Sequence, residues 1–399
     1  MSFKEDDFRA VLRLGEEWKV LSAETDHASE TVVVRVGSDR GQRFPCPGCG
    51  KACPAHDFIE REWRSLDVGA YRCVVRARLP RTDCPECGVR QVVPGWAREY
   101  SRYSIPFERR CMGLVADMPV ASVARHMGVS DDALWLIAKH YVDAAMGGVD
   151  MSCVTNVGVD ETSSKRGHDY ITIFVDMDTR RTLFATEGKD SSAVERFADF
   201  LEAHGGDRNK VASVSSDMSA AFICGVRESL PKAAITFDRF HVMKLANDAV
   251  DEVRKEESAK TADLADARYL LARNRRDLSE GQKARVRLLF KDNVRIMAAY
   301  GVKEALATMY RLSCKDAARV HMYTWLGMSE SCTGPIKRLA ETVRAHLEGI
   351  VQWHDSKVTN AVLEGLNSVI QAVRRMARGY RRAESMITIL YLRSAGIRV

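Results

Sequence analysis

The stretch Val157-Gly158-Val159-Asp160-Glu161-Thr162 decides how the largest part of this chain folds, because an apolar, β-forming run leads directly into carboxylates. The apolar and β-branched residues over 154–159 predict a buried strand that ends at Asp160. A single aspartate at a strand end is usually a turn or cap residue. Asp160 therefore becomes a candidate for chemistry only if other acidic residues meet it.

The sequence that follows predicts the other strands of a sheet. The run Ile171-Thr172-Ile173-Phe174-Val175 is largely apolar on both faces, which is typical of a central strand. A helix is predicted over 191–203, where apolar residues recur on one face. The predicted strands cover residues 154–159, 170–177, 182–185, 211–215 and 233–237. Three strands in series, a helix, and then a strand that pairs with the first is the order of a ribonuclease H-like α/β domain.

Two more acidic residues complete a candidate site. Asp217 ends the fourth predicted strand, so it emerges at the same sheet edge as Asp160 if the two strands are neighbours. Glu364 lies in a predicted helix, where it shares a polar stripe with Asn360 and Asn367 beside an apolar face. A polar stripe bordered by apolar residues can point from a packed helix into a site.

Converging carboxylates suit oxygen-binding divalent cations such as Mg²⁺ or Mn²⁺. Two such ions roughly 3.5–4 Å apart activate a water or a 3′-hydroxyl for in-line phosphoryl transfer. Without a metal the carboxylates would repel, and one of them would keep its proton. The sequence therefore predicts two Mg²⁺ (or Mn²⁺) ions and catalysis at Asp160, Asp217 and Glu364.

Four of the eleven cysteines form two matching knuckles, Cys46-Pro47-Gly48-Cys49-Gly50 and Cys84-Pro85-Glu86-Cys87-Gly88. Each Cys-x-x-Cys lets two thiolates reach one metal, and the following glycine leaves backbone amides free to face sulfur. Four thiolates make a closed tetrahedral site, which is typical of structural zinc. The sequence predicts one structural Zn²⁺ on Cys46, Cys49, Cys84 and Cys87, with Cys53 and His56 as nearby alternatives.

Two segments around the knuckles predict contacts with nucleic acid. Between the knuckles, Arg72, Arg76 and Arg78 share one face of a predicted strand, so one side of that hairpin is expected to be basic. Residues 118–130 have the form of a helix-turn-helix, whose second helix commonly lies in the major groove. Ser130 suits the cap of that helix, and we expect Arg125 and Ser130 to contact DNA.

The positive charge of the chain is uneven. Lys+Arg 60 against Asp+Glu 54 gives a net charge of +6, and residues 371–399 alone hold seven arginines against one glutamate. Clustered arginines suit phosphate, although a solvated helical face is the alternative. The candidates for contact with the DNA backbone lie roughly three to five helical turns beyond Glu364, if that helix continues past Gly379. They are Arg374, Arg375, Arg378, Arg381 and Arg382.

Composition excludes several classes of protein. With 46% hydrophobic and 29% charged residues, the chain is not collagen-like, a disulfide scaffold or wholly disordered. No apolar run approaches the roughly 18 residues of a membrane span. The acidic start lacks the apolar stretch of a secretory signal, so we expect a soluble intracellular protein without a membrane partner.

Taken together, the order of these motifs resembles the bacterial insertion-sequence transposases of the ISL3 family over nearly the whole chain. The resemblance includes Phe237-Asp238-Arg239-Phe240-His241, and it implies that Asp238 and His241 lie near the site. It implies a DDE enzyme with the triad Asp160, Asp217 and Glu364, which cuts the ends of an element and joins them to target DNA. Double-stranded DNA would be its partner and the cytoplasm, in the bacterial nucleoid, its location. Pairing two ends favours a homodimer or a larger assembly.

The predicted architecture is α/β, with a ribonuclease H-like catalytic domain interrupted by an α-helical insertion and preceded by a zinc-ribbon-like module and a helix-turn-helix. The helical sequence that follows residue 241 is too long for a loop and therefore predicts the insertion. The expected parts are an N-terminal segment (1–40), the zinc module (41–100), the helix-turn-helix (105–150), the catalytic domain (151–245 and 355–399) and the insertion (246–354).

Two other classes of protein remain compatible with the sequence alone. One is a DNA-binding regulator whose ribonuclease H-like part is an inactive scaffold. The other is a metal-dependent nuclease that cuts DNA without strand transfer.

Overall fold

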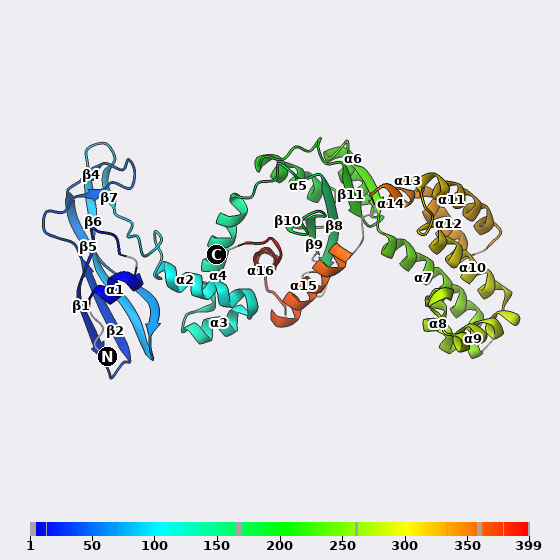
Figure 1. Cartoon of the computed structure of the whole chain (residues 1–399), viewed down its shortest axis with the longest axis horizontal. Helices are drawn as coiled ribbons and strands as arrows, with labels where there is room; N and C mark the ends of the chain where they lie inside the picture. Colours follow the sequence, from blue (N-terminus) through cyan, green and yellow to red (C-terminus); the bar gives the residue numbers. More distant parts are fainter. Residues whose placement is uncertain are drawn as a thin grey trace. The chain divides into compact units, whose positions relative to one another are not determined.

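The computed structural model describes residues 5–12, 14–163, 170–259, 262–332, 334–356, 361–377 and 379–397 (Figure 1). These residues separate into two units, one ending at Tyr141 and the other beginning at Val142. Within the described ranges, no helix is both long enough and apolar enough to cross a membrane.

The first unit is built on a long hairpin, β5 (Ala55–Val68) and β6 (Tyr71–Cys84). The strand order is β1-β2-β6-β5, with the short β7 also paired to β6. Because β2 runs parallel to β6, residues 1–40 contribute strands to the same sheet as the zinc module. The remaining elements of this unit are α1 (Glu5–Leu12), β1 (Lys19–Asp26), β2 (Thr31–Gly37), β3 (Phe44–Pro45), β4 (Ala52–Cys53), β7 (Gly88–Gln91), α2 (Ile105–Asp117) and α3 (Val120–Met127), and α4 (Asp131–Gly147) begins in it.

Alternation along β6 explains how this sheet buries one face. Residues at every second position of the strand, from Cys73 to Leu79, are buried, whereas Arg78 among them and Arg72 just before them are exposed. The buried face packs against a cluster of tryptophans in which the Trp18 and Trp96 ring centroids lie 4.9 Å apart. The zinc knuckles are therefore attached to a well-packed sheet.

The second unit contains a five-stranded sheet in the order β10-β9-β8-β11-β12. The antiparallel strands are β8 (Asn156–Ser163), β9 (Tyr170–Asp176) and β10 (Thr182–Glu187), and β11 (Ser213–Ser216) and β12 (Ala234–Phe237) run parallel to β8. All five predicted strands are present, and the fourth pairs with the first as expected. The predicted helix is α5 (Ser192–Ala203), whose Phe197 stacks on Phe174 of β9 with ring centroids 4.3 Å apart.

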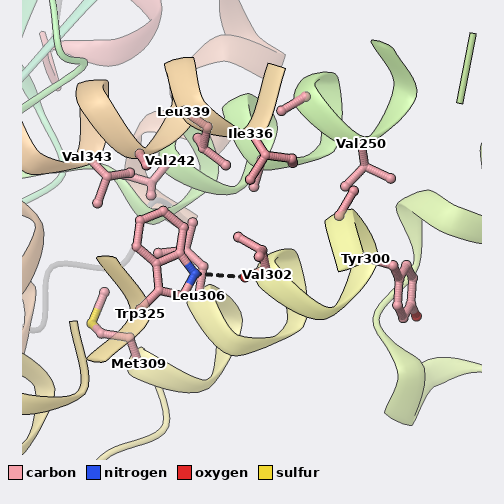
Figure 2. Close-up of a cluster of buried hydrophobic side chains, with 14 of the residues drawn as sticks. Val242, Val250, Tyr300, Val302, Leu306, Met309, Trp325, Ile336, Leu339 and Val343 are labelled. Atoms are coloured by element: carbon pink, nitrogen blue, oxygen red, sulfur yellow. Dashed lines mark hydrogen bonds between the residues drawn. The ribbon is translucent and has the colours of Figure 1, made fainter. Parts of the chain in front are cut away.

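The described residues of 239–356 form helices joined by short connections, and they share a core with β12 and α6 (Ala220–Ser229) through Phe237 and Ile223. Figure 2 shows this core around Trp325, whose indole N–H donates to the carbonyl of Val302 over 2.8 Å. Its elements are α7 (Arg239–Ser258), η1 (Ala262–Ala267), α8 (Arg268–Ala272), η2 (Arg275–Asp277), α9 (Glu280–Lys291), α10 (Val294–Met309), α11 (Lys315–Glu330), α12 (Pro335–Ala345), α13 (Leu347–Val351) and α14 (Trp353–Ser356).

Two C-terminal helices, α15 (Ala361–Ala377) and α16 (Ala383–Ser394), return to the sheet. Helix α16 contacts β10, where the backbone N–H of Ala185 donates to the Tyr391 hydroxyl over 2.7 Å. A second contact joins the hydroxyl oxygens of Thr182 and Ser394, also 2.7 Å apart. Because α15 packs against α16, this docking ties the helix that carries Glu364 to the sheet.

Replacing Trp325 by alanine should lower the free energy of unfolding by about 3–5 kcal/mol, because it removes a large buried side chain and leaves a cavity. The measurement is urea unfolding followed by far-ultraviolet circular dichroism. Tyr323 lies on the same helix and is 57% exposed, so Tyr323→Ala should change the stability by at most about 0.5 kcal/mol. Equal effects of the two substitutions would contradict the packing in Figure 2.

Candidate active site and zinc centre

Strand register carries three aspartates to one edge of the second sheet. Ser215 of β11 pairs with Gly158 of β8, so two residues further on Asp217 is level with Asp160. Ser216 pairs with Phe237 of β12, so Asp238 is level with Asp217. Since all three strands are parallel, their carboxyl ends meet at the same edge. The pairing supports the expectation that Asp160 and Asp217 lie level with each other. Asp160 does not end its strand as predicted, however, because β8 continues to Ser163 along β9, and Asp160 lies where the pairing with β11 stops.

Each of these aspartates is held by a local backbone contact. One carboxylate oxygen of Asp160 accepts from the N–H of Glu161 over 2.8 Å, and one of Asp217 accepts from Ser219 over 3.0 Å. Asp238 is buried and caps α7 by accepting from the N–H of Phe240 over 2.7 Å. These turn and cap contacts restrict the rotamers of the carboxylates.

His241 interacts electrostatically with all three aspartates, Asp160, Asp217 and Asp238, which we call the carboxylate row. Its Nδ1 is 3.0 Å from the second carboxylate oxygen of Asp238. Asp238 raises the pKa of His241 above its usual value, and the negative charges of Asp160 and Asp217 add to that effect, while burial opposes it. The family resemblance placed Asp238 and His241 near the site, and these interactions are consistent with that placement.

Two charged groups near the row were not predicted from the sequence. Burial raises the pKa of Glu161, the charges of Asp217 and Asp160 raise it further, and Lys189 opposes them. The ammonium of Lys189 lies 4.0 Å from the ring centroid of Tyr170. Glu161 directly follows Asp160, which is a signal that the sequence did offer, but nothing in the sequence pointed to Lys189.

The third member of the predicted triad is placed only by its helix. Glu364 and Asn367 belong to α15, but their side chains lie outside what the structure describes, as does all of Asn360. The convergence of Glu364 with the two aspartates therefore stays a prediction.

The arginine-rich tail does not form one continuous helix, so the condition that the helix continues past Gly379 is not met. Helix α15 ends at Ala377, with Arg374 and Arg375 in its last turn. Gly379 has φ 104°, a conformation that breaks the helix and that residues with a side chain rarely adopt. Arg381 and Arg382 follow as exposed residues just before α16, and Arg378 lies outside the described residues.

The two cysteine knuckles meet in the first unit. The sulfur atoms of Cys46, Cys49, Cys84 and Cys87 all lie within 4.8 Å of one another. A tetrahedral zinc ion with Zn–S bonds of about 2.3 Å would hold its sulfurs about 3.8 Å apart, so the four thiols fit such an ion. Cys53 is buried beside this cluster, whereas His56 is exposed and lies 3.6 Å from Asp57. The four predicted ligands are thus the ones that come together.

The electrostatics of the knuckles also fit a cation. The backbone N–H groups of Cys87 and Glu86 lower the pKa of the Cys84 thiol to about 6. Crowding by Cys49, together with burial, raises the pKa of Cys87 to about 12. Four thiols at this spacing cannot all ionise unless a positive charge compensates them. This arrangement supports a structural zinc ion.

The hairpin face that was expected to be basic carries both signs of charge. Arg76 forms an ion pair with Glu62 on the neighbouring strand, and Arg78 lies over the Phe58 ring at 5.4 Å. Cross-strand pairing explains the difference, because acidic residues of β5 lie opposite the arginines of β6. Arg72 remains exposed.

The helix-turn-helix elements are α3 and α4, joined by a turn at Gly128 with φ 66°. The Ser130 hydroxyl accepts from the N–H of Ala133 over 3.2 Å, so Ser130 caps α4 as predicted. Arg125 is exposed, with its guanidinium 3.5 Å from the Ser122 hydroxyl. Contact of Arg125 and Ser130 with DNA stays a prediction.

Comparison with known proteins identifies the class. The family model for the ISL3 transposases matches residues 157–390. A model for the helix-turn-helix domain of transposase family ISL3 matches residues 91–142. A third model, for the zinc-finger of transposase IS204/IS1001/IS1096/IS1165, matches residues 42–87. The fold and its modules therefore define a transposase with a DNA-binding helix-turn-helix. The chain belongs to the ISL3 family of insertion-sequence transposases.

Two curated relatives extend over most of the chain. The transposase for insertion sequence element IS1557 of Mycobacterium tuberculosis is 26% identical over 427 aligned residues, covering 98% of this chain and 96% of the relative. The transposase for insertion sequence element IS1001 of Bordetella parapertussis is 25% identical over 350 residues, covering 85% of this chain and 86% of the relative.

Changing Cys84 to serine should abolish binding of one zinc ion per chain, because a hydroxyl is a poor substitute for a thiolate ligand. Zinc content is measured by atomic emission, and packing of the tryptophan core by near-ultraviolet circular dichroism. The zinc content and the dichroism signal should fall together, because metal binding contributes to folding. Cys153 is exposed and belongs to the other unit, so Cys153→Ser is the matched control and should keep the full zinc content. A Cys84→Ser protein that still binds one equivalent would contradict the assignment.

Proposed function

We propose that this chain is a DDE transposase that binds the terminal inverted repeats of an insertion sequence, cleaves DNA phosphodiester bonds and joins the 3′-hydroxyl ends to target DNA. The observation that carries this proposal is the register that brings Asp160 and Asp217 to one edge of the sheet. The order of its strands supports a ribonuclease H-like catalytic domain, with the helical residues after β12 as an insertion.

Asp160, Asp217 and Glu364 would hold two Mg²⁺ or Mn²⁺ ions. Carboxylate oxygens are the donors that these cations prefer, and the two aspartates already concentrate negative charge at one edge. When bound, the ions supply Lewis-acid activation of the attacking oxygen and stabilise the leaving oxygen.

The other residues of the chain position the DNA. Asp238 caps α7 and keeps His241 beside the carboxylate row, where the imidazole can orient a phosphate oxygen or a carboxylate. Asn360 and Asn367 would extend the polar stripe of Glu364 towards the site. The remaining predicted contacts with the DNA backbone or bases are Arg72, Arg76, Arg78, Arg125, Ser130, Arg374, Arg375, Arg378, Arg381 and Arg382.

End recognition is assigned to the zinc module and the helix-turn-helix. Helix α4 would enter the major groove, and the arginines would neutralise phosphates, so binding should weaken steeply with salt. Bringing two ends together requires two copies of these modules, so we propose a dimer or a larger assembly on DNA in the bacterial nucleoid.

Changing Asp160 to asparagine should abolish DNA cleavage while specific binding of the element ends persists, because the substitution removes a metal-binding charge with little change of shape. Cleavage and strand transfer are measured with a labelled end duplex and a plasmid target, and end binding with the same duplex in a mobility-shift assay. Asp178 lies beyond the other end of β8 and accepts from Asn156 over 3.0 Å, so Asp178→Asn is the matched control and should stay active.

The same assay separates the proposal from its rivals. A regulator would bind the ends without cutting, and a nuclease would cut without joining the end to the plasmid. Cleavage by Asp160→Asn at the wild-type rate would remove the proposed role of that residue.

Glu364→Gln should weaken Mn²⁺ binding to the DNA-free protein by a factor of ten or more, since one pair of opposite charges at close range contributes at least about 1.4 kcal/mol. Isothermal titration with MnCl₂ measures this independently of catalysis. Glu341 is exposed on α12, so Glu341→Gln should leave the affinity unchanged. Unchanged affinity in Glu364→Gln would place that side chain away from the metal site.

A further inference from the structure

A second concentration of positive charge lies in the helical part of the chain. Residues 268–295 contain nine lysines and arginines against three aspartates and glutamates. This excess equals the net charge of the whole protein, as does the excess in the arginine-rich tail. The segment spans α8, η2, α9 and the first residues of α10, and α9 packs against both α8 and α10 (Figure 1).

Helix α9 presents this charge in a regular row. Ser279 and Gln282 form a capping box at its start, and its buried residues are Val286 and Leu289. On the side facing solvent, Lys283, Arg287 and Lys291 follow one another at i, i+4 and i+8, and we name these three residues the α9 stripe. Over eight residues the stripe extends for about 12 Å.

The α9 stripe is poorly neutralised. Lys283 forms an ion pair with Glu280 over 2.8 Å, and the guanidinium of Arg287 donates to the carbonyl of Lys283 over 3.4 Å. Among the described residues, no carboxylate lies within ion-pair distance of Arg287 or Lys291. Like charges one turn apart repel, so the stripe weakens its own helix in the absence of an anionic partner.

Other arginines in the same helical region behave differently. Arg254, Arg295, Arg319, Arg338 and Arg344 each pair with a carboxylate. A solvated surface usually mixes both signs in this way. Arg287 and Lys291, which lack such a pair, thus depart from the pattern of the surrounding helices.

Further cations lie beside the α9 stripe. The guanidinium of Arg273 donates to the side chain of Gln282 over 3.3 Å, which brings the end of α8 next to the first turn of α9. Arg275 and Arg276 follow in η2, and both are exposed, with Arg276 3.3 Å from the carboxylate of Asp277. Arg285 is also exposed, on the other side of the outward face.

We propose that the α9 stripe, together with these neighbouring arginines, binds the phosphate backbone of duplex DNA. The inference rests on the proposed function, which makes duplex DNA the substrate, and it assigns to the helical region a contact separate from the zinc module, the helix-turn-helix and the tail. A row of cations one helical turn apart is complementary to the closely spaced phosphates of a DNA strand. Such contacts hold the duplex and read no sequence.

The test compares the salt dependence of DNA binding. The full-length variant K283Q/R287Q/K291Q removes the three charges, and its affinity for duplex DNA is measured by fluorescence anisotropy at several salt concentrations. Each phosphate contact contributes about 0.9 to the slope of log K against log salt, so the slope should become shallower by roughly 2 to 3. The ratio of affinities for an element end and for a scrambled duplex should stay unchanged.

The matched control removes three exposed positive charges outside α9. Lys232, Arg311 and Lys337 are exposed, so K232Q/R311Q/K337Q makes the same change in net charge and should keep the wild-type slope. Equal slopes for the two triple variants would overturn the proposal, because any effect would then reflect net charge alone. A wild-type slope in the α9 variant would also overturn the proposal. An acidic protein would then be the better candidate for the partner of the stripe.

The outcome is independent of the proposed chemistry. If the wild-type protein bound DNA but never cut it, the proposed transposase activity would fail while the slope still tested the α9 stripe.

Should the triple variant not fold, as judged by circular dichroism, the single variant K291Q should lower the slope by about one, and K291R should restore it. A wild-type slope in folded K291Q would count against the proposal.

Discussion

The parallel pairing of β8, β11 and β12 is the constraint on which the candidate active site depends. Backbone hydrogen bonds between the strands set Asp160, Asp217 and Asp238 level with one another. A slip of one residue in either ladder would move an aspartate along its strand and turn it to the other face. The sheet thus concentrates acidic groups that would otherwise avoid one another.

Concentrating carboxylates requires compensation, and the structure supplies part of it. His241 and Lys189 interact with the acidic groups, and a backbone N–H one or two residues further on donates to one oxygen of each aspartate. The four clustered thiols pose the same problem, because a cation is needed to balance their charge if all four ionise. In both clusters the fold holds groups close together that repel one another when ionised, and a bound metal ion would offset that repulsion.

Sequence reasoning succeeded where local pattern determines structure. The apolar runs predicted the strands of the second sheet, and the repeated Cys-Pro-x-Cys-Gly predicted the ligands that meet. It failed where the answer depends on partners distant in sequence. The acidic residues of β5 that neutralise Arg76 become visible only once the register is known, and the parallel pairing of β2 with β6 leaves no local signature. The sequence leaves open whether the helix of Glu364 continues past Gly379, and only the backbone conformation of that glycine shows that it does not.

The docking of α16 onto β10 gives the protein a built-in order of assembly. Tyr391 contacts a strand residue that lies 206 positions earlier, so this contact can form only after residue 391 has been synthesised. The helices of the helix-turn-helix, by contrast, are complete once residue 147 has been made. During translation the helix-turn-helix can therefore fold well before α16 completes the support of the second sheet.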